Sequence, residues 1–276
     1  MKKNNKMLCL LLILLLTFYL CTTVVTAQDE TFNNILKENV VKIGFCVDTP
    51  PMKFRDTNGE ITGICADLSK AIARDLGVEL EYVFSDWGGL IPNLLSGRSD
   101  LIVGDMAVTT DRSKKVIFTD PWIRMPGSIT AVMADSEWES VEDLNKESVK
   151  IGVILGARGQ QMAKAHIPKA TISTYDSNTE QTLSLKQGRI DAIINEKVLM
   201  EREVAQSEGL LRILGEPLEY TAAHIALRSD DYRLWFWLND WLFTMERSGE
   251  LKKLLNYWIE TNEWEKDYPE FASTKK

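Results

Sequence analysis

Apolar residues along this chain form two patterns: short continuous runs, and stretches in which they recur every third or fourth position. The continuous runs in the first part of the chain are residues 40–47, 80–84 and 101–103, and their length predicts buried strands. Between them, the spacing over 64–76 predicts a helix ended by Gly77, and 90–95 a shorter helix ended by Gly97. This alternation predicts a parallel sheet with right-handed crossovers.

The middle of the chain repeats this alternation. It begins with a helix start at 140–143, and Ser177 with Glu180 has the spacing of a capping box at the start of a later helix. The remaining predicted elements are strands at 151–154, 192–194 and 222–227 and a helix at 160–165. Two amphipathic helices, around 234–245 and 251–259, finish the chain.

Two short segments occur twice. VKIG at 41–44 recurs at 149–152, and Gly-Arg-x-Asp followed by an apolar run begins at both Gly97 and Gly188. A chain that builds one α/β unit twice is expected to have two lobes. Small polar molecules bind between such lobes, beyond the carboxyl ends of the strands.

The order of elements predicts how the chain divides between the lobes. We expect one lobe from residues 28–127 with 224–276, because the C-terminal helices have no sheet of their own, and the other from 128–223. The chain then crosses twice between the lobes, near 128–131 and 222–226. The fold class is α/β, with a central sheet flanked by helices in each lobe, and the two crossing strands are expected to act as a hinge.

Residues 1–27 have the pattern of a secretory signal peptide. Three lysines precede the apolar run 10–16, and small residues precede a cleavage site after Ala27. An uncleaved anchor is the alternative, and lipid attachment at Cys21 is disfavoured because Leu20 is bulky. We expect an exported protein, periplasmic or secreted.

Charge narrows the choice of partners. Without residues 1–27, the chain has 29 basic and 40 acidic residues, a net charge of −11. Such an acidic protein is poorly suited to nucleic acid or anionic lipid, because binding to both depends on neutralising phosphate charge. We expect a monomer with a small-molecule ligand.

Two cysteines follow the predicted signal peptide, Cys46 and Cys65. In an oxidising compartment they are a candidate disulfide. Two buried thiols are the alternative, because the spacing does not show whether their Cα atoms come close enough.

The order of several motifs resembles a known family. The motifs are PPMKF at 50–54, GICADL at 63–68, ARDLGV at 73–78, DWGGLIP at 86–92, TTDR at 109–112, FTDPW at 118–122 and SGEL at 248–251, ahead of Trp258. Together they resemble bacterial extracellular solute-binding proteins of the polar amino-acid family, and they cover most of the chain. The resemblance implies a periplasmic-binding-protein-like, two-lobed receptor that delivers its ligand to the membrane subunits of an ABC transporter.

The resemblance also implies ligand contacts. Arg112 matches the arginine that holds a ligand carboxylate, and a guanidinium suits this role because its planar fork meets both oxygens. Thr109 matches a hydroxyl contact and Trp87 an aromatic that packs on the ligand. An ordinary surface charge at Arg112 and ordinary core packing at Trp87 are the alternatives.

Other positions depart from the family pattern. Glu196 stands where an aspartate usually holds the ligand's ammonium, and Met52 replaces a phenylalanine. Thr49 falls where some members have a stacking aromatic, and Ala107 replaces a frequent hydroxyl residue. These replacements change the expected shape and polarity of the pocket, but the negative charge that would hold the ligand's ammonium is kept at Glu196.

Arg158 lies where the family commonly has threonine. If it faces the cleft it needs a second anionic group or Glu196 as a partner; the alternative is that it points to solvent. We therefore expect a ligand that is acidic or another small carboxylate rather than an aliphatic amino acid.

Cyclohexadienyl dehydratases share this fold and are the enzymatic alternative. Their general acid corresponds by position to Leu199, which has no proton to transfer, although Glu196 and Glu201 are near in sequence. We expect no catalysis. Neither His166 nor His224 has metal-ligand spacing, and no phosphate-binding loop is present, so we expect no metal and no cofactor.

Overall fold

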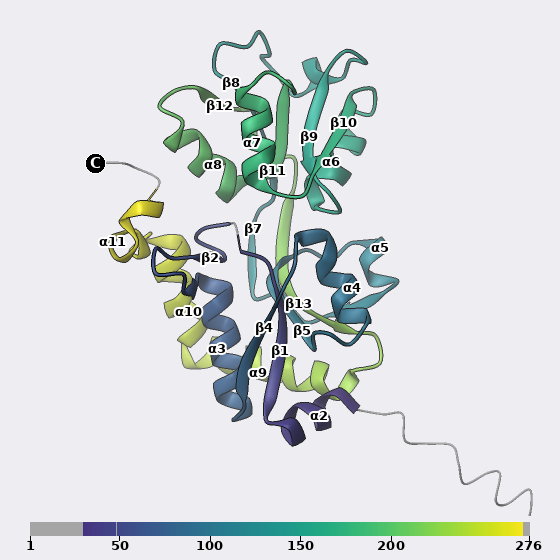
Figure 1. Ribbon diagram of the computed structural model, residues 1–276, viewed down its shortest axis with the longest axis vertical. Helices are drawn as coiled ribbons and strands as arrows, with labels where there is room; N and C mark the ends of the chain where they lie inside the picture. Colours follow the sequence, from purple (N-terminus) through teal and green to yellow (C-terminus); the bar gives the residue numbers. More distant parts are fainter. Residues whose placement is uncertain (1–29, 48, 273–276) are drawn as a thin grey trace, which may run out of the picture.

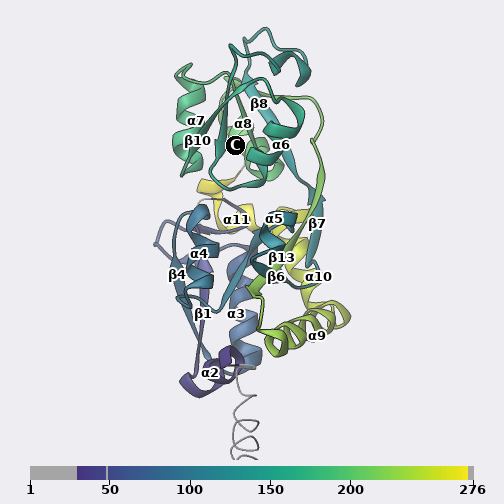
Figure 2. The same ribbon diagram turned by 90° about the vertical axis from the view of Figure 1, so that its right-hand side faces the viewer.

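The computed structural model describes residues 30–47 and 49–272. The predicted signal peptide and its cleavage site after Ala27 lie outside these residues. Figures 1 and 2 show two bodies stacked along the long axis, each built around its own sheet. The two-lobed α/β fold predicted from the sequence is therefore confirmed.

The first lobe contains a six-stranded sheet in the order β4–β1–β5–β13–β6, with β7 also paired to β13. Its strands are β1 (Val40–Phe45), β4 (Glu79–Phe84), β5 (Leu101–Met106), β6 (Val116–Phe118), β7 (Ile123–Pro126) and β13 (Tyr220–Arg228). β1 is parallel to both β4 and β5, as predicted, and β13 returns antiparallel. A small hairpin, β2 (Phe54–Arg55) and β3 (Ile61–Thr62), connects β1 to the first long helix.

Both faces of this sheet are buried. On one face Leu101 packs in a cluster with α3 (Ile64–Leu76), and on the other Ile102 packs with α4 (Leu90–Leu95). Adjacent residues of a strand point to opposite faces, which explains why β5 is apolar along most of its length and fully buried. Gly77 ends α3 in the left-handed conformation, φ 71°, as its position in the sequence predicts.

The chain termini complete the first lobe. The helices are α2 (Glu30–Glu38), α9 (Tyr232–Ser248), α10 (Glu250–Leu255) and α11 (Trp264–Asp267), with a π-helical turn Asn256–Glu260 and a 3-10 turn Pro269–Phe271. α9 contributes Trp241 and α10 contributes Leu251 to the same cluster as α3, so the C-terminal helices pack on the first lobe as expected. Trp235 and Trp237 are partly buried against that cluster.

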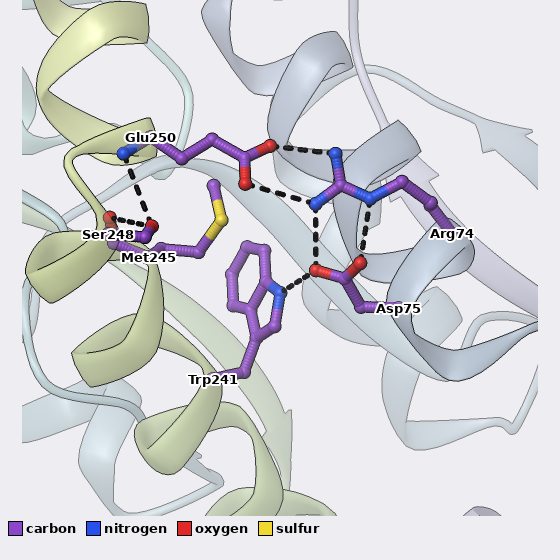
Figure 3. Close-up of polar contacts among 6 residues, drawn as sticks. All are labelled: Arg74, Asp75, Trp241, Met245, Ser248 and Glu250. Carbon is purple, nitrogen blue, oxygen red and sulfur yellow. Dashed lines mark hydrogen bonds and ion pairs between the residues drawn. The ribbon is translucent and has the colours of Figure 1, made fainter.

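Figure 3 shows the polar contacts that join α3 to α9 and α10. Arg74 donates to both carboxylate oxygens of Asp75 and to both of Glu250, and Trp241 Nε1 donates to Asp75 Oδ2 at 2.8 Å. The SGEL motif therefore lies where the C-terminal helices attach to the first lobe.

The second lobe has a five-stranded sheet in the order β10–β9–β11–β8–β12. Its elements are β8 (Ser128–Met133), a 3-10 turn Glu142–Leu144, β9 (Lys150–Ile154), α6 (Arg158–His166), β10 (Thr171–Tyr175), α7 (Asn178–Lys186), β11 (Ala192–Glu196), α8 (Lys197–Gln206) and β12 (Leu211–Leu214). The helix expected at 140–143 is a single turn. Ser177 caps α7 by accepting from the Glu180 N–H, as predicted.

One of the two segments that cross between the lobes differs from the prediction. Residues 128–131 lie inside the second sheet, paired with β11 and β12, and this crossing is made by β7. The other crossing, predicted near 222–226, lies in β13 as expected. β13 pairs with β7 in its first half and with β5 and β6 in its second half, and the apolar pattern of a strand does not indicate which strands it pairs with. The sequence therefore did not predict that β7 takes part in the crossing. The division into 28–127 with 224–276 and 128–223 remains a proposal.

Within the described residues, no helix is long and apolar enough to span a bilayer.

Candidate functional site

Two adjoining cavities lie between the lobes and share Trp87 and Glu196 in their walls. The large cavity has a volume of about 430 Å³. Its polar lining is Thr49, Lys53, Ser85 and Asp86 from the first lobe and Asp176, Ser177, Asn178, Asn195 and Glu196 from the second. The small cavity is lined by Asp105, Ala107 and Arg112 from the first lobe and by Ser128, Arg158 and Glu196 from the second. Both lie at the carboxyl ends of strands, where α/β proteins bind ligands.

Arg112 is held by its own short helix. It lies in α5 (Thr110–Ser113), and the Thr109 hydroxyl caps this helix by accepting from the Arg112 N–H at 3.2 Å. The guanidinium donates to the carbonyl of Ala107 at 2.8 Å and, across the cleft, to that of Gly156 at 2.9 Å. Burial lowers the pKa of Arg112 and Glu196 opposes this, but an arginine remains charged. Both acceptors are neutral carbonyl oxygens, so these hydrogen bonds do not place an anion beside the guanidinium charge.

Trp87 lies beside two cations. Its ring centroid is 5.5 Å from Arg112 Cζ and 5.3 Å from Lys53 Nζ, within the range of a cation–π attraction. Its Nε1 donates to the Gly156 carbonyl at 3.4 Å. Trp87 also packs against the α4 side of the first lobe, so it is both part of the core and part of the cavity wall.

Glu196 ends β11 and reaches the cleft from the second lobe. Opposite it, Asp105 and Lys53 form a buried ion pair with Nζ and Oδ1 2.6 Å apart. Burial opposes the charged form of Lys53, yet the Asp105 carboxylate raises the Lys53 pKa well above its usual value. Burial also opposes ionisation of Asp105, but the positive charge of Lys53 lowers the Asp105 pKa.

Arg158 has a partner that the sequence did not indicate. Its Nε lies 2.6 Å from Glu219 Oε2 and 2.8 Å from Oε1, and its Nη1 donates to Gln161 at 2.9 Å. Neither Glu196 nor solvent is therefore the counterpart that we expected. Glu219 lies on the segment that leads into β13, so this ion pair joins α6 to the crossing strands.

The other expected contacts are placed as follows. Thr49 lines the large cavity, and Met52 and Ala107 line the small one. Thr109 contributes to neither wall and acts on the site by positioning Arg112. Met52 is buried, so it shapes the cavity floor.

Cys46 and Cys65 are buried thiols, so the disulfide alternative is wrong for this structure. Cys46 belongs to the cluster on the α4 side of the first sheet and Cys65 to the cluster on the α3 side. The sheet therefore lies between the two cores that hold them. Burial raises the pKa of Cys65 well above its usual value, which keeps it protonated.

The position of a dehydratase's general acid is occupied by a buried apolar residue. Leu199 lines the large cavity and is 2% exposed. Glu201, the other nearby carboxyl, is exposed and paired with Lys197 on the surface of α8. Among the described residues, no group of three or more His, Cys, Asp or Glu side chains could hold a metal ion.

Lys53 and Asp105 were missed in the sequence. The signal was present, since Asp105 is an acid near the end of a buried apolar strand and Lys53 follows a Pro-Pro-Met loop. A charged residue in such a run is costly to bury unless it is paired. Neither residue alone indicates its partner, because 52 positions separate them.

The cleft presents an arginine from one lobe and carboxyls from both. This arrangement is complementary to a small molecule that carries a carboxylate and an ammonium group.

Comparison with known proteins agrees with this chemistry. The profile of the bacterial extracellular solute-binding proteins, family 3, matches residues 41–261. The L-cystine-binding protein TcyJ of Escherichia coli (strain K12) is 26% identical over 235 residues, covering 84% of this chain and 87% of TcyJ. The solved structure of holo ArgBP from T. maritima matches with a TM-score of 0.72 and 33% identity, over 78% of this chain and 93% of that one.

One enzyme is also similar. The cyclohexadienyl dehydratase of Pseudomonas aeruginosa is 21% identical over 237 residues, covering 85% of this chain and 88% of the enzyme.

Proposed function

The chain belongs to family 3 of the bacterial extracellular solute-binding proteins, and on this premise we propose that its cleft binds a zwitterionic α-amino acid between the lobes. The protein is an extracytoplasmic receptor that captures an amino acid or small carboxylate for an ABC importer, and it is not an enzyme. The proposal concerns the finer points: which residues hold the ligand and which side chains the cleft prefers.

The observation that carries the proposal is the placement of Arg112 and Glu196 in the wall of one small cavity, from opposite lobes. Arg112 is positioned to meet the ligand carboxylate with its planar fork. The first turn of α6 begins at the same cavity, and its N-terminal end favours an anion. Glu196 is positioned to meet the ammonium. A ligand with both groups bridges the lobes and stabilises the closed cleft.

The large cavity is where the amino-acid side chain would lie. Its wall includes the carboxyls of Asp86, Asp176 and Glu196, and Lys53, the one cation among its described lining residues, is already paired with Asp105. Arg158, on which we had based a preference for acidic ligands, is neutralised by Glu219. These charges favour a basic side chain, or a neutral one rich in hydrogen-bond donors, over an acidic one.

We propose that residues 1–27 direct export and are cleaved after Ala27, and that the mature protein acts as a monomer.

The selectivity is tested by thermal shift of the wild-type protein with L-arginine, L-glutamine, L-cystine, L-glutamate and L-leucine. A ligand at 100 times its Kd adds about 2.7 kcal/mol of stability, which is readily measured. We expect L-arginine, L-glutamine or L-cystine to raise the melting temperature more than L-glutamate or L-leucine does. The largest shift with L-glutamate would overturn the assigned selectivity.

A control for the enzymatic alternative uses the same preparation. Prephenate and arogenate are incubated with the wild-type protein, and we expect no product above the rate without protein, because Leu199 cannot transfer a proton. Formation of phenylpyruvate or phenylalanine that depends on the protein would contradict this.

A further inference from the structure

The Asp105 carboxyl has one oxygen that the Lys53 ion pair does not use. Both side chains of the pair are almost completely buried, 0% exposed for Asp105 and 3% for Lys53. Oδ1 meets Lys53 Nζ at 2.6 Å, whereas Oδ2 receives no hydrogen bond from an N–H group or hydroxyl of the described residues. Asp105 also lines the small cavity with Arg112 and Glu196. A buried carboxylate oxygen without a donor is costly, so its position beside the cavity calls for an explanation.

Glu196 lines the same small cavity from the other lobe. The cavity therefore has two carboxyls in its wall, one from each lobe. Two ionised carboxylates have no hydrogen to donate to each other and repel, so a group that carries hydrogen-bond donors and a positive charge is needed between them.

The described residues around Asp105 and Glu196 do not supply a second donor to Asp105. Lys53 is engaged with Oδ1, and Arg112 donates to the carbonyls of Ala107 and Gly156. Cys46 and Cys65 are the remaining titratable groups that act on Lys53 from this side, and both are thiols.

We propose that Asp105 is a second ligand-binding carboxylate, which together with Glu196 holds the ammonium group of the bound amino acid. The inference rests on the proposed function and adds a residue and a specificity to the same site. An ammonium has three hydrogens, enough to donate to both carboxyls at once. Lys53 keeps Asp105 ionised and fixed from behind.

This arrangement makes closure depend on what occupies the cleft. With an ammonium between them, Asp105 and Glu196 attract the lobes together. Without it the two carboxylates repel each other, so the empty cleft stays open. Asp105→Asn removes one of the two charges and is expected to favour closure of the empty protein.

The first test is the Asp105→Asn variant, with calorimetric titration of L-arginine and L-glutamine and of their des-amino analogues, 5-guanidinopentanoate and 4-carbamoylbutanoate. We expect Asp105→Asn to lower the affinity for the amino acid that binds by at least about 10-fold, and to change the affinity for its des-amino analogue little. Equal losses for the amino acid and its analogue would show a purely structural role and overturn the proposal.

Two further variants serve as controls. Asp111→Asn also removes one carboxylate, but from an exposed side chain paired with Lys114, and is expected to bind like the wild type. Because Asp105→Asn leaves Lys53 buried without its counter-ion, the double variant Lys53→Met/Asp105→Asn removes both charges. It is expected to fold and to show the same selective loss; wild-type affinity for the amino acid in this double variant would overturn the proposal.

A second test needs no ligand and separates this inference from the proposed function. Small-angle scattering of the empty proteins at neutral pH is expected to give a smaller radius of gyration for Asp105→Asn than for the wild type. If neither amino acid binds the wild type, the proposed ligands are wrong and this scattering result alone decides the role of Asp105. Equal radii for Asp105→Asn and the wild type would contradict it.

Discussion

Arg112 shows how local and long-range contacts combine at a single residue. Thr109 fixes the helix turn that carries it, and the carbonyls of Ala107 and Gly156 fix the plane of its guanidinium. The side chain is 7% exposed and faces the small cavity. Its charge is thus held in place before any ligand arrives, which lowers the entropy that binding costs.

Substitution of Arg112 tests this role. Arg112→Ala is expected to weaken amino-acid binding by at least about 2 kcal/mol, since it removes a charge-assisted bidentate contact. Arg112→Lys is expected to bind poorly as well, because an ammonium cannot reproduce the planar fork. Calorimetry gives the affinities and circular dichroism confirms that both variants fold. Wild-type affinity in either variant would remove Arg112 from the site.

The sequence was informative about Arg112 and Glu196 because both lie in motifs whose order resembles a family. It failed for Arg158, where the neighbouring residues indicated a cation without a partner but not Glu219, which is 61 positions away. It failed in the same way for the pair Lys53 and Asp105. Partners that meet only after folding leave no local pattern, so a site residue is predictable where its role is set nearby and unpredictable where a distant chain segment sets it.

At the scale of elements, the internal repeat has a structural cause. In the first lobe the Asp100 carboxylate accepts from the Lys42 N–H at 2.9 Å, and in the second the Asp191 carboxylate accepts from the Lys150 N–H at 2.7 Å. The Gly-Arg-x-Asp segment thus connects the start of β5 to its parallel neighbour β1, and the start of β11 to its parallel neighbour β9. Gly97 and Gly188 lie in the left-handed region, with φ of 73° and 66° respectively.

Elements were predictable where their apolar pattern is strong. The helix over 64–76 was found with its end at Gly77, and the strands β1, β4, β5, β9, β11 and β13 were found in order, whereas β8, β12 and α8 were missed. β10 was missed as well, because its residues are mostly polar and none is fully buried. An edge strand of this kind is defined by pairing with β9, which the sequence of the strand does not show.

The contact between α3 and the C-terminal helices predicts that the stability of the protein depends on pH. The hydrogen bond from Arg74 lowers the pKa of Asp75, against the opposing effect of its partial burial. A carboxyl whose pKa is lowered by folding stabilises the protein above its unfolded pKa of about 3.9, and this stability is lost as the pH falls through the folded value. Asp75→Asn is therefore expected to be less stable than the wild type at pH 7, by at most about 1 kcal/mol because the contact is partly exposed.

Urea unfolding at pH 7 and pH 3 measures this difference. It is expected to shrink at pH 3, where the wild-type carboxylate is being protonated. The same difference at both values would mean that Asp75 does not contribute through its charge.

At the scale of the whole molecule, the lobes are also joined outside the cleft, by a contact separate from the crossing strands. Arg202 Nε and Gln206 Nε2 on α8 donate to the carbonyls of Phe271 and Ala272, at 3.0 and 2.9 Å. Phe271 in turn packs on Phe54 of the first lobe, with ring centroids 4.8 Å apart. Figure 2 shows α11, which leads into this segment, at the level of the boundary between the lobes. The end of the chain therefore connects the second lobe to the first outside the cavities.

This contact is expected to favour the closed form. The double variant Arg202→Ala/Gln206→Ala removes two hydrogen bonds between the lobes and is expected to weaken amino-acid binding by about fivefold, although neither residue lines a cavity. Lys186→Ala, an exposed change on α7 of the same lobe, serves as the control and should leave the affinity unchanged. Equal affinities in the double variant and the control would show that the contact does not contribute to closure.

The central claim is that the cleft recognises both the carboxylate and the ammonium of an α-amino acid. The most direct measurement is calorimetric titration of the wild-type protein with L-arginine, L-glutamine and L-cystine, each followed by its α-decarboxylated amine. We expect at least one amino acid to bind and its amine to bind about 100-fold more weakly, since the amine offers nothing to Arg112. An amine that binds as tightly as its amino acid, or the absence of binding by all three amino acids, would contradict the account.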